Sequence, residues 1–348
     1  MLETIGDSMK DLSMKKVLII YTGGTIGMKD TDAGYAPVGG YLLDELKKID
    51  DLNRGGMPHW DFVELSPLLD SSNISANEWN NMSKIIVDKY ADYDGFVILH
   101  GTDTMAYTSS ALSFILHGLD KPVVLTGSQI PLCEIRSDAR DNLISSIIIA
   151  GEGQVKEVCL CFGGKLLRGN RATKTSADKL VAFDSPNYPY LAEMGISVKY
   201  NPSAFGKYGG ASLEYRPFSP VPIGVLKIFP GMQFGLFESI ITEKLSGVVL
   251  ETFGAGNIPN GGDDLLPIIK KAFKAGAVVT VCSQCVAGAV SLGTYETSSA
   301  LKKAGAVSGK DMTTESAVAK LYHLFSMGYT TDKIKTLMEE NLAGELTF

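Results

Sequence analysis

The chain has 348 residues, of which 45% are hydrophobic and 20% are charged, a composition typical of a globular protein with a sizeable core. Its net charge of −7 and the lack of a strong basic run argue against a nucleic-acid partner. Its longest apolar stretches are far shorter than the ~20 residues that cross a bilayer, so we expect no membrane segment. Length alone suggests two domains or one large one.

The first residues do not have the pattern of a secretory signal. Residues 1–13 are mixed and acidic, and the apolar run that follows Lys16 stops at Gly23. A signal would need a charged start, a longer apolar core and a cleavage site with small residues. We therefore expect a cytoplasmic protein with a short N-terminal leader over residues 1–14.

The cysteines are odd in number and do not form the framework of a secreted disulfide protein. They are Cys133, Cys159, Cys161, Cys282 and Cys285, and most lie inside apolar runs. The last two have the spacing of a redox or metal pair, but no second pair matches them. We expect buried thiols instead.

Residues 15–201 alternate short β-rich runs with segments of helical period. The expected strands are 17–21, 95–99, 122–126 and 157–162, and the expected helices are 76–90 and 137–150. This alternation is typical of a parallel sheet covered by helices. We expect a larger N-terminal α/β catalytic domain of flavodoxin-like or Rossmann-like type.

Proline and glycine are frequent over residues 202–222, which we interpret as a linker. A second alternating set follows, with strands expected at 223–228, 247–250 and 277–282 and helices at 265–274, 314–326 and 331–338. The sequence therefore predicts a smaller C-terminal α/β domain over residues 223–348. No fixed-period repeat is present, which excludes a solenoid.

Two segments far apart in the sequence each end an apolar run with glycines and hydroxyls: YTGGTIG at 21–27 and LHGTDTMAY at 99–107. Ligands of open parallel sheets bind beyond the carboxyl ends of the strands, where both segments lie. Gly23 and Gly24 would let a substrate approach the main chain and would present the Thr25 hydroxyl. Thr25 could also cap a following turn, and Thr102 or Asp103 could cap a helix.

A third segment, RGNRATKTS at 168–176, adds a lysine to these hydroxyls. It places Lys174 in a polar loop, where a lysine is ordinarily exposed. Neither glycine segment matches a nucleotide-binding motif, because GGTIG lacks the GxGxxG spacing and the Gly-Lys-Ser/Thr of a P-loop is missing.

These motifs carry a resemblance to a known family. TGGTIGM, DYDGFVILHGTDTMAYTSSALSF, KPVVLTGSQIPL, RGNRATK and GNIP occur in the order found in bacterial asparaginases of the cytoplasmic, type I class. The chain resembles that family from about Lys15 to near its C-terminus, and the two threonine motifs together are highly specific. The resemblance implies hydrolysis of the side-chain amide of L-asparagine through a covalent acyl-threonine, without a metal or organic cofactor.

The resemblance also implies roles for single residues. Thr25 matches the nucleophile, and Tyr35 lies beside it on a glycine-containing loop over 28–40 whose closure would exclude water. Thr102, Asp103 and Lys174 match the second triad of the family.

The same comparison of motifs identifies the residues that would hold the substrate. Asp70, Ser71 and Ser72 resemble the segment that binds the α-carboxylate and α-amino groups of asparagine. Asp103 would also pair with the α-ammonium group, beside Thr102.

A threonine hydroxyl is a poor nucleophile at neutral pH and needs a base or a matched electrostatic environment. A lysine must first be deprotonated to act as that base, which costs about 4–5 kcal/mol and is opposed by a nearby carboxylate. Two divisions of labour therefore stay open: a relay through Lys174 and Thr102, or Tyr35 as the partner of Thr25 in the first step. Either route needs backbone N–H groups, for which those of Thr25 and Thr102 are candidates.

The family builds each site between two subunits, which implies a homodimer or a dimer of dimers. Asn257 in FGAGN matches the contribution of the partner's C-terminal domain, and either Tyr295 or Glu296 would reach the α-amino group. Some type I members bind asparagine at a second, activating site with a cysteine that matches Cys285 and an arginine. Here Glu251 stands at the position of that arginine and would repel the effector's carboxylate, which argues against this site.

Two alternatives remain from the sequence. The ammonia-generating subunit of a tRNA-dependent amidotransferase should carry an extra N-terminal domain, whereas about 14 residues precede the first expected strand. A non-catalytic amino-acid sensor would use the same cleft, but every matched catalytic side chain is present. The preference between asparagine and glutamine depends on one methylene, worth about 1–3 kcal/mol, and is not set by these motifs.

Overall fold

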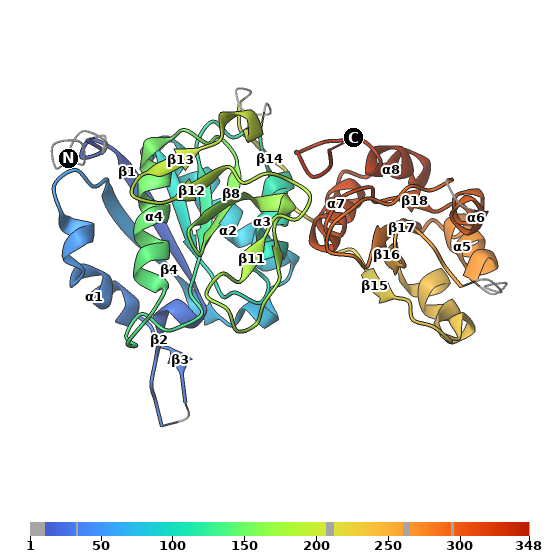
Figure 1. Cartoon of the computed structure of the whole chain (residues 1–348), viewed down its shortest axis with the longest axis horizontal. Helices are drawn as coiled ribbons and strands as arrows, with labels where there is room; N and C mark the ends of the chain where they lie inside the picture. The colour runs from blue at the N-terminus through green and yellow to red at the C-terminus, as the bar shows by residue number, and fades with distance from the viewer. Residues whose placement is uncertain (1–10, 33, 207–211, 260–264, 294–295, 348) are drawn as a thin grey trace. The chain divides into compact units, whose positions relative to one another are not determined.

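The computed structural model describes residues 11–32, 34–206, 212–259, 265–293 and 296–347. The chain divides into two compact units, Met1–Tyr215 and Arg216–Phe348, and each is α/β (Figure 1). No helix among the described residues is long and apolar enough to cross a membrane.

The first unit is built on an eight-stranded sheet with the strand order β13-β12-β9-β8-β7-β5-β1-β4. Its strands are β1 (Lys16–Gly23), β4 (His59–Leu69), β5 (Gly95–Leu99), β7 (Val123–Thr126), β8 (Val158–Phe162), β9 (Lys165–Arg168), β12 (Ala192–Met194) and β13 (Val198–Tyr200). Five neighbouring strands are parallel: β8, β7, β5, β1 and β4. The remaining three strands, β9, β12 and β13, extend the sheet in antiparallel pairs.

Helices cover both faces of this sheet. They are α1 (Tyr41–Lys47), α2 (Ala76–Asp88), α3 (Met105–Ile115) and α4 (Ala139–Glu152). Val17, Ile19 and Tyr21 of β1 share a core with side chains of α1 and α4. The intervening Leu18 and Ile20 are equally buried, on the face where α3 packs against β7 and β8 and against α2 (Figure 1). Burial on both faces explains why these strands are continuous apolar runs.

Short elements connect the strands and carry most of the candidate site. They are η1 (Thr25–Gly27), β2 (Met28–Lys29), β3 (Ala36–Pro37), η2 (Asp50–Asn53), η3 (Ser71–Asn73), η4 (Tyr90–Asp92), β6 (Leu116–His117), η5 (Gly169–Arg171), β10 (Thr173–Lys174), β11 (Phe183–Asp184), η6 (Pro202–Ala204) and β14 (Glu214–Tyr215). β10 and β11 form an antiparallel pair, as do β2 and β3.

The second unit contains the parallel sheet β15-β16-β17-β18. Its elements are β15 (Ile223–Lys227), η7 (Phe234–Phe237), η8 (Ile240–Lys244), β16 (Gly247–Thr252), α5 (Leu265–Lys274), β17 (Val278–Ser283), α6 (Glu296–Ala304), β18 (Val307–Ser308), α7 (Thr314–Ser326) and α8 (Thr331–Met338). Side chains of α5 and α6 share a core with Val248 and Leu250, whereas α7 and α8 pack directly against the strands.

The predicted fold class is confirmed: both units are α/β, with a larger, mostly parallel sheet in the first. Each strand and helix predicted above is present, within two residues at either end. The division between units falls inside the expected linker 202–222, and β14 from this stretch pairs with β6 of the first unit. Of the expected leader, residues 1–10 lie outside the described residues, and Leu12 is buried.

The expectation that the cysteines are buried is wrong for two of them. Cys159, Cys161 and Cys282 are buried free thiols, but Cys133 and Cys285 are exposed. Cys133 and Cys285 follow apolar strands without being part of them, so the burial of the strands does not extend to these two side chains.

Candidate active site

Three strand ends meet at the carboxyl edge of the larger sheet. Gly23 pairs with Leu69 at the end of β4, and Gly24 lies against Gly101, just beyond β5. Both Gly23 and Gly24 have positive φ, +123° and +86°, and a Cβ on either would collide with the backbone of the facing segment. The two glycines therefore allow β1 and its neighbours to approach backbone to backbone.

This contact brings the two threonine segments together, because Thr25 follows Gly24 and Thr102 follows Gly101. Thr25 is the first residue of η1 and is partly buried. Its hydroxyl makes no hydrogen bond to any described residue and does not cap η1, whose N-cap is Gly24. The structure thus leaves the Thr25 hydroxyl available for a substrate.

Thr102, Asp103 and Lys174 form a compact polar cluster. The Lys174 Nζ donates to Thr102 Oγ1 at 2.9 Å and to Asp103 Oδ1 at 2.7 Å. Thr102 is only 7% exposed, whereas the Asp103 side chain is 69% exposed. The cluster therefore joins a buried hydroxyl to a carboxylate that a ligand can reach.

The expected location of Lys174 was wrong. It lies on the short strand β10 and not in a loop, and its side chain is 20% exposed. The pairing of Lys174 with Phe183 of β11 holds the lysine backbone in a hairpin, which directs its side chain toward Thr102.

Gln129 is a functional candidate that the sequence analysis did not single out. Thr102 Oγ1 donates to Gln129 Oε1 at 3.1 Å, and Gln129 Nε2 donates to the Lys179 carbonyl at 3.2 Å. Since an ammonium can only donate, the Thr102 hydroxyl accepts from Lys174 and sends its own proton to Gln129. The available signal was its place in KPVVLTGSQIPL, just beyond β7 and therefore at the same sheet edge.

Tyr35 lies between β2 and β3 and is 49% exposed. Its hydroxyl donates to Glu134 Oε1 at 2.6 Å, and this hydrogen bond raises the pKa of Tyr35 to about 12. Tyr35 is therefore bound to Glu134 and not to Thr25, and its phenol is protonated at neutral pH.

The segment from Asp70 to Ser72 lies beside these glycines. Asp70 Oδ1 accepts from the Ser72 N–H at 3.0 Å and caps η3, and the Ser71 carbonyl accepts from Thr104 Oγ1 at 2.7 Å. Ser71 is buried, whereas Asp70 and Ser72 are exposed. The second contact ties η3 to the residue that precedes α3, so Asp70 and Asp103 belong to one connected framework.

The remaining predicted residues belong to the second unit. Asn257 and Phe253 exchange backbone hydrogen bonds of 2.8 and 3.0 Å, which close the FGAGN turn. Tyr295 lies outside the described residues, and Glu296 begins α6. Glu251 Oε1 accepts from Thr314 Oγ1 at 2.6 Å.

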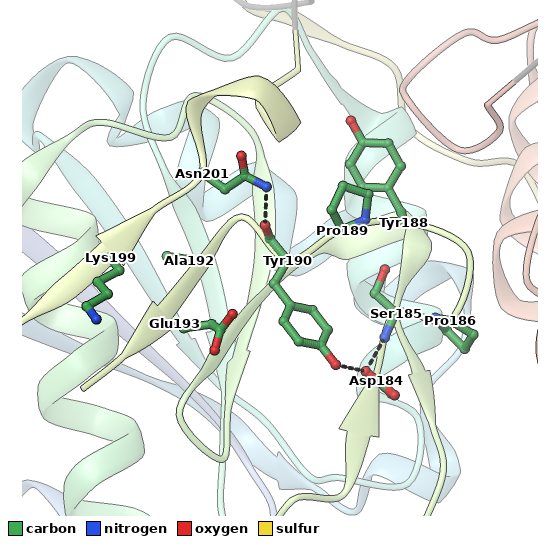
Figure 2. Close-up of a pocket in the computed structure, with 10 residues that line it drawn as sticks. All are labelled: Asp184, Ser185, Pro186, Tyr188, Pro189, Tyr190, Ala192, Glu193, Lys199 and Asn201. Atoms are coloured by element: carbon green, nitrogen blue, oxygen red, sulfur yellow. Dashed lines mark hydrogen bonds between the residues drawn. The ribbon is translucent and has the colours of Figure 1, made fainter.

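A surface pocket of about 410 Å³ is lined by the end of β11 and by residues that follow it in the chain (Figure 2). Asp184 and Tyr190 line it, and the Tyr190 hydroxyl donates to Asp184 Oδ1 at 2.7 Å. None of the predicted catalytic residues lines this pocket. Within the described ranges, no three His, Cys, Asp or Glu side chains are grouped so that they could hold a metal ion.

Comparisons with known proteins agree with this arrangement. Residues 16–205 match the family model "Asparaginase, N-terminal", and residues 222–338 match "Glutaminase/Asparaginase C-terminal domain". L-asparaginase 1 of Escherichia coli strain K12 is 42% identical over 336 residues, which cover 97% of this chain and 99% of that protein.

Solved structures give the same result. The crystal structure of L-asparaginase I from Vibrio cholerae matches with a TM-score of 0.89 and 41% identity, covering 96% of this chain and 99% of that one. The L-asparaginase from Thermococcus kodakarensis matches with a TM-score of 0.87 and 32% identity over the same shares. The resemblance to the type I class is confirmed, and the chain belongs to the asparaginase family of amidohydrolases.

Proposed function

We propose that this amidohydrolase converts L-asparagine to L-aspartate and ammonia, with Thr25 as the nucleophile. The observation that carries the proposal is the backbone contact between Gly24 and Gly101, which brings Thr25 next to the cluster of Thr102 and Lys174. The Thr25 hydroxyl has no hydrogen-bond partner among the described residues, which supports the same role because a nucleophile must be free to reach its substrate.

The proposed reaction has two steps. The Thr25 hydroxyl oxygen attacks the carbon of the side-chain amide, the carbon–nitrogen bond breaks, and ammonia leaves with the proton of the hydroxyl. A β-aspartyl ester then remains on Thr25. Water attacks this ester, L-aspartate leaves, and a proton returns to the Thr25 oxygen. The backbone N–H groups of Thr25 and Thr102 would stabilise the oxyanion formed in each step.

For the proton transfers we favour the relay through Lys174 and Thr102, since these two side chains are already in contact at 2.9 Å. Such general acid–base help typically contributes 10²–10⁴-fold. The route through Tyr35 requires its hydroxyl to leave Glu134 first. We expect Tyr35 to act when the hairpin of β2 and β3 closes over a bound substrate.

The substrate's charged ends would be held by the carboxylates around the glycines. Asp70 and Asp103 are both exposed, and their charge suits an α-ammonium group. Ser71 and Ser72 complete the segment that we propose for the α-amino and α-carboxylate groups, without a cofactor.

We further propose that the enzyme is a homodimer or a dimer of dimers, in which the partner's C-terminal domain completes each site. Asn257, together with Tyr295 or Glu296, would supply that contribution. A cytoplasmic location is proposed as well, supported by the similarity to the type I class. Sedimentation of the purified protein tests the assembly.

An ammonia-release assay with L-asparagine and L-glutamine over a broad concentration range tests the activity and its preference. We expect release from asparagine by the wild-type protein and none by Thr25→Ala, with the fold of the variant confirmed by circular dichroism. A wild-type protein that binds asparagine without releasing ammonia would instead be a sensor. Undiminished turnover by Thr25→Ala would end the assignment of the nucleophile.

A further inference from the structure

His100 stands between the end of β5 and the Gly101–Thr102 step of the candidate site. Its backbone N–H donates to the Thr126 carbonyl at 2.9 Å, which continues the pairing of β5 with β7 by one residue. Its ring is completely buried, and no step of the proposed reaction uses it. Buried imidazole nitrogens ordinarily have hydrogen-bond partners, and both nitrogens of His100 have one.

The partners form a chain of hydrogen bonds that starts on α2. Trp79 Nε1 donates to Thr108 Oγ1 at 3.0 Å, Thr108 Oγ1 lies 2.9 Å from His100 Nε2, and His100 Nδ1 lies 2.7 Å from the Gly101 carbonyl oxygen. The last contact joins an imidazole nitrogen to a group that can only accept. The Nδ1 atom must therefore carry the proton.

The rest of the chain agrees with this tautomer. Thr108 accepts from the indole of Trp79 and is left with its one hydroxyl proton to donate, which a deprotonated Nε2 can accept. Burial lowers the pKa of His100 to about 4, so the ring is neutral at neutral pH. Every donor and acceptor in the chain is then matched.

The peptide that His100 holds directly follows the point at which the two threonine segments meet. A Cβ on Gly24 would lie 2.4 Å from both the N and the Cα of Gly101. The Gly101 carbonyl is attached to that Cα and belongs to the same peptide group as the Thr102 N–H. Fixing this carbonyl fixes the plane of that peptide and so the direction of the Thr102 N–H. That N–H is a proposed oxyanion donor, and the Thr102 side chain is the proposed relay.

We propose that His100 is a positioning residue: its Nδ1–H, kept in that tautomer by Thr108 and Trp79, orients the Gly101–Thr102 peptide against the Thr25 segment. This role rests on the proposed function of Thr25 and Thr102. It places the control of a catalytic peptide on α2 and α3, two helices whose side chains need not touch the substrate.

Two substitutions of His100 distinguish the roles of its two ring nitrogens. His100→Asn keeps an N–H donor near the position of Nδ1, whereas His100→Gln extends its amide toward the position of Nε2 and loses the donor to Gly101. We expect His100→Gln to lower kcat by about 10- to 100-fold with KM nearly unchanged. We expect His100→Asn to recover most of this loss although it removes the bond to Thr108.

A second pair of substitutions changes Thr108 and leaves His100 in place. Thr108→Val removes the hydroxyl that donates to Nε2, so the ring can move its proton to Nε2 and release Gly101. We expect a fall in kcat with Thr108→Val and recovery with Thr108→Ser. The kcat values are compared per folded protein, with the folded fraction of each variant taken from its melting curve.

The tautomer can be observed without activity. In nitrogen-15 NMR of the histidine side chains, the signals of His100, identified by their loss in His100→Asn, should show a protonated Nδ1 and an unprotonated Nε2. A proton on Nε2, or equal kcat in the Asn and Gln variants, would overturn the positioning role. Failure of the wild-type enzyme to release ammonia would instead count against the proposed function. The NMR result is independent of that outcome.

Discussion

Gly24 offers the sharpest perturbation of the candidate site. Its φ of +86° and ψ of 175° lie in a region that only glycine adopts readily, and a side chain there costs about 1–3 kcal/mol. A Cβ on Gly24 would also lie within 3.0 Å of Gly101 Cα, Gly101 N and the carbonyl carbon of His100, where ordinary contact begins at 3.4 Å. The substitution Gly24→Ala must therefore push the two segments apart by about 1 Å.

Such a displacement separates Thr25 from Thr102 without removing a reactive group. Because a misplacement of 1 Å can cost about 10²-fold in rate, we expect Gly24→Ala to lower kcat by roughly that factor. We expect its free energy of unfolding to fall by about 1–3 kcal/mol, the cost of the backbone strain. Ammonia release measures the first quantity, and urea unfolding the second.

Gly231 provides a matched control. Its φ is +85°, nearly that of Gly24, but a Cβ there would meet no atom within 4 Å. Gly231→Ala should therefore lose a similar amount of stability and keep its activity. If Gly24→Ala retained kcat like the control, the contact between the glycine segments would not be needed to bring the two threonines together, and this account of the site would be refuted.

Four further outcomes are expected. The unfolded chain protonates His100 near its ordinary pKa of 6.5 and the folded protein only at about 4, so the free energy of unfolding should fall by about 3 kcal/mol from pH 6.5 to 4. This component should be missing in urea titrations of His100→Asn. Lys320 and Glu345 form a fully buried ion pair of 2.6 Å, and Glu345→Gln, which leaves the ammonium without its countercharge, should destabilise the second unit by about 3–5 kcal/mol; a melting temperature equal to the wild type would contradict this. Gln129→Ala, which leaves the Thr102 proton without its acceptor, should lower kcat and change KM little, whereas an unchanged kcat would show that Gln129 does not orient the hydroxyl. The rate should rise hyperbolically with asparagine concentration because Glu251 carries the wrong charge for a second effector site, and a clearly sigmoidal curve would show the opposite.

The sequence was sufficient for the elements whose pattern is local. β5 is a short apolar run between turn residues, and α7 begins behind the capping Thr313, so both were predicted with their observed bounds. β4 was missed although it has 11 residues, because its sequence HWDFVELSPLL mixes polar and apolar positions and most of its side chains are only partly buried. Its place depends on pairing with β1, which is not a local property.

The candidate site likewise combines features that the local sequence predicts with features that depend on long-range pairing. Residue types and motif order pointed to Thr25, Thr102 and Lys174, but the location of Lys174 on a strand depends on its pairing with β11. The hydrogen bond between Tyr35 and Glu134 joins residues 99 positions apart, and no spacing rule predicts it. Gln129 likewise acquires its role only when β5 and β7 lie side by side.

The central claim is that the Thr25 oxygen becomes acylated by the substrate. Rapid acid quenching of the enzyme during turnover of L-asparagine, followed by mass spectrometry of its peptides, tests this directly. The account predicts a β-aspartyl ester on Thr25 that is missing in Thr25→Ala. An ester on another residue, or ammonia released with no acylated enzyme at any quenching time, would contradict it.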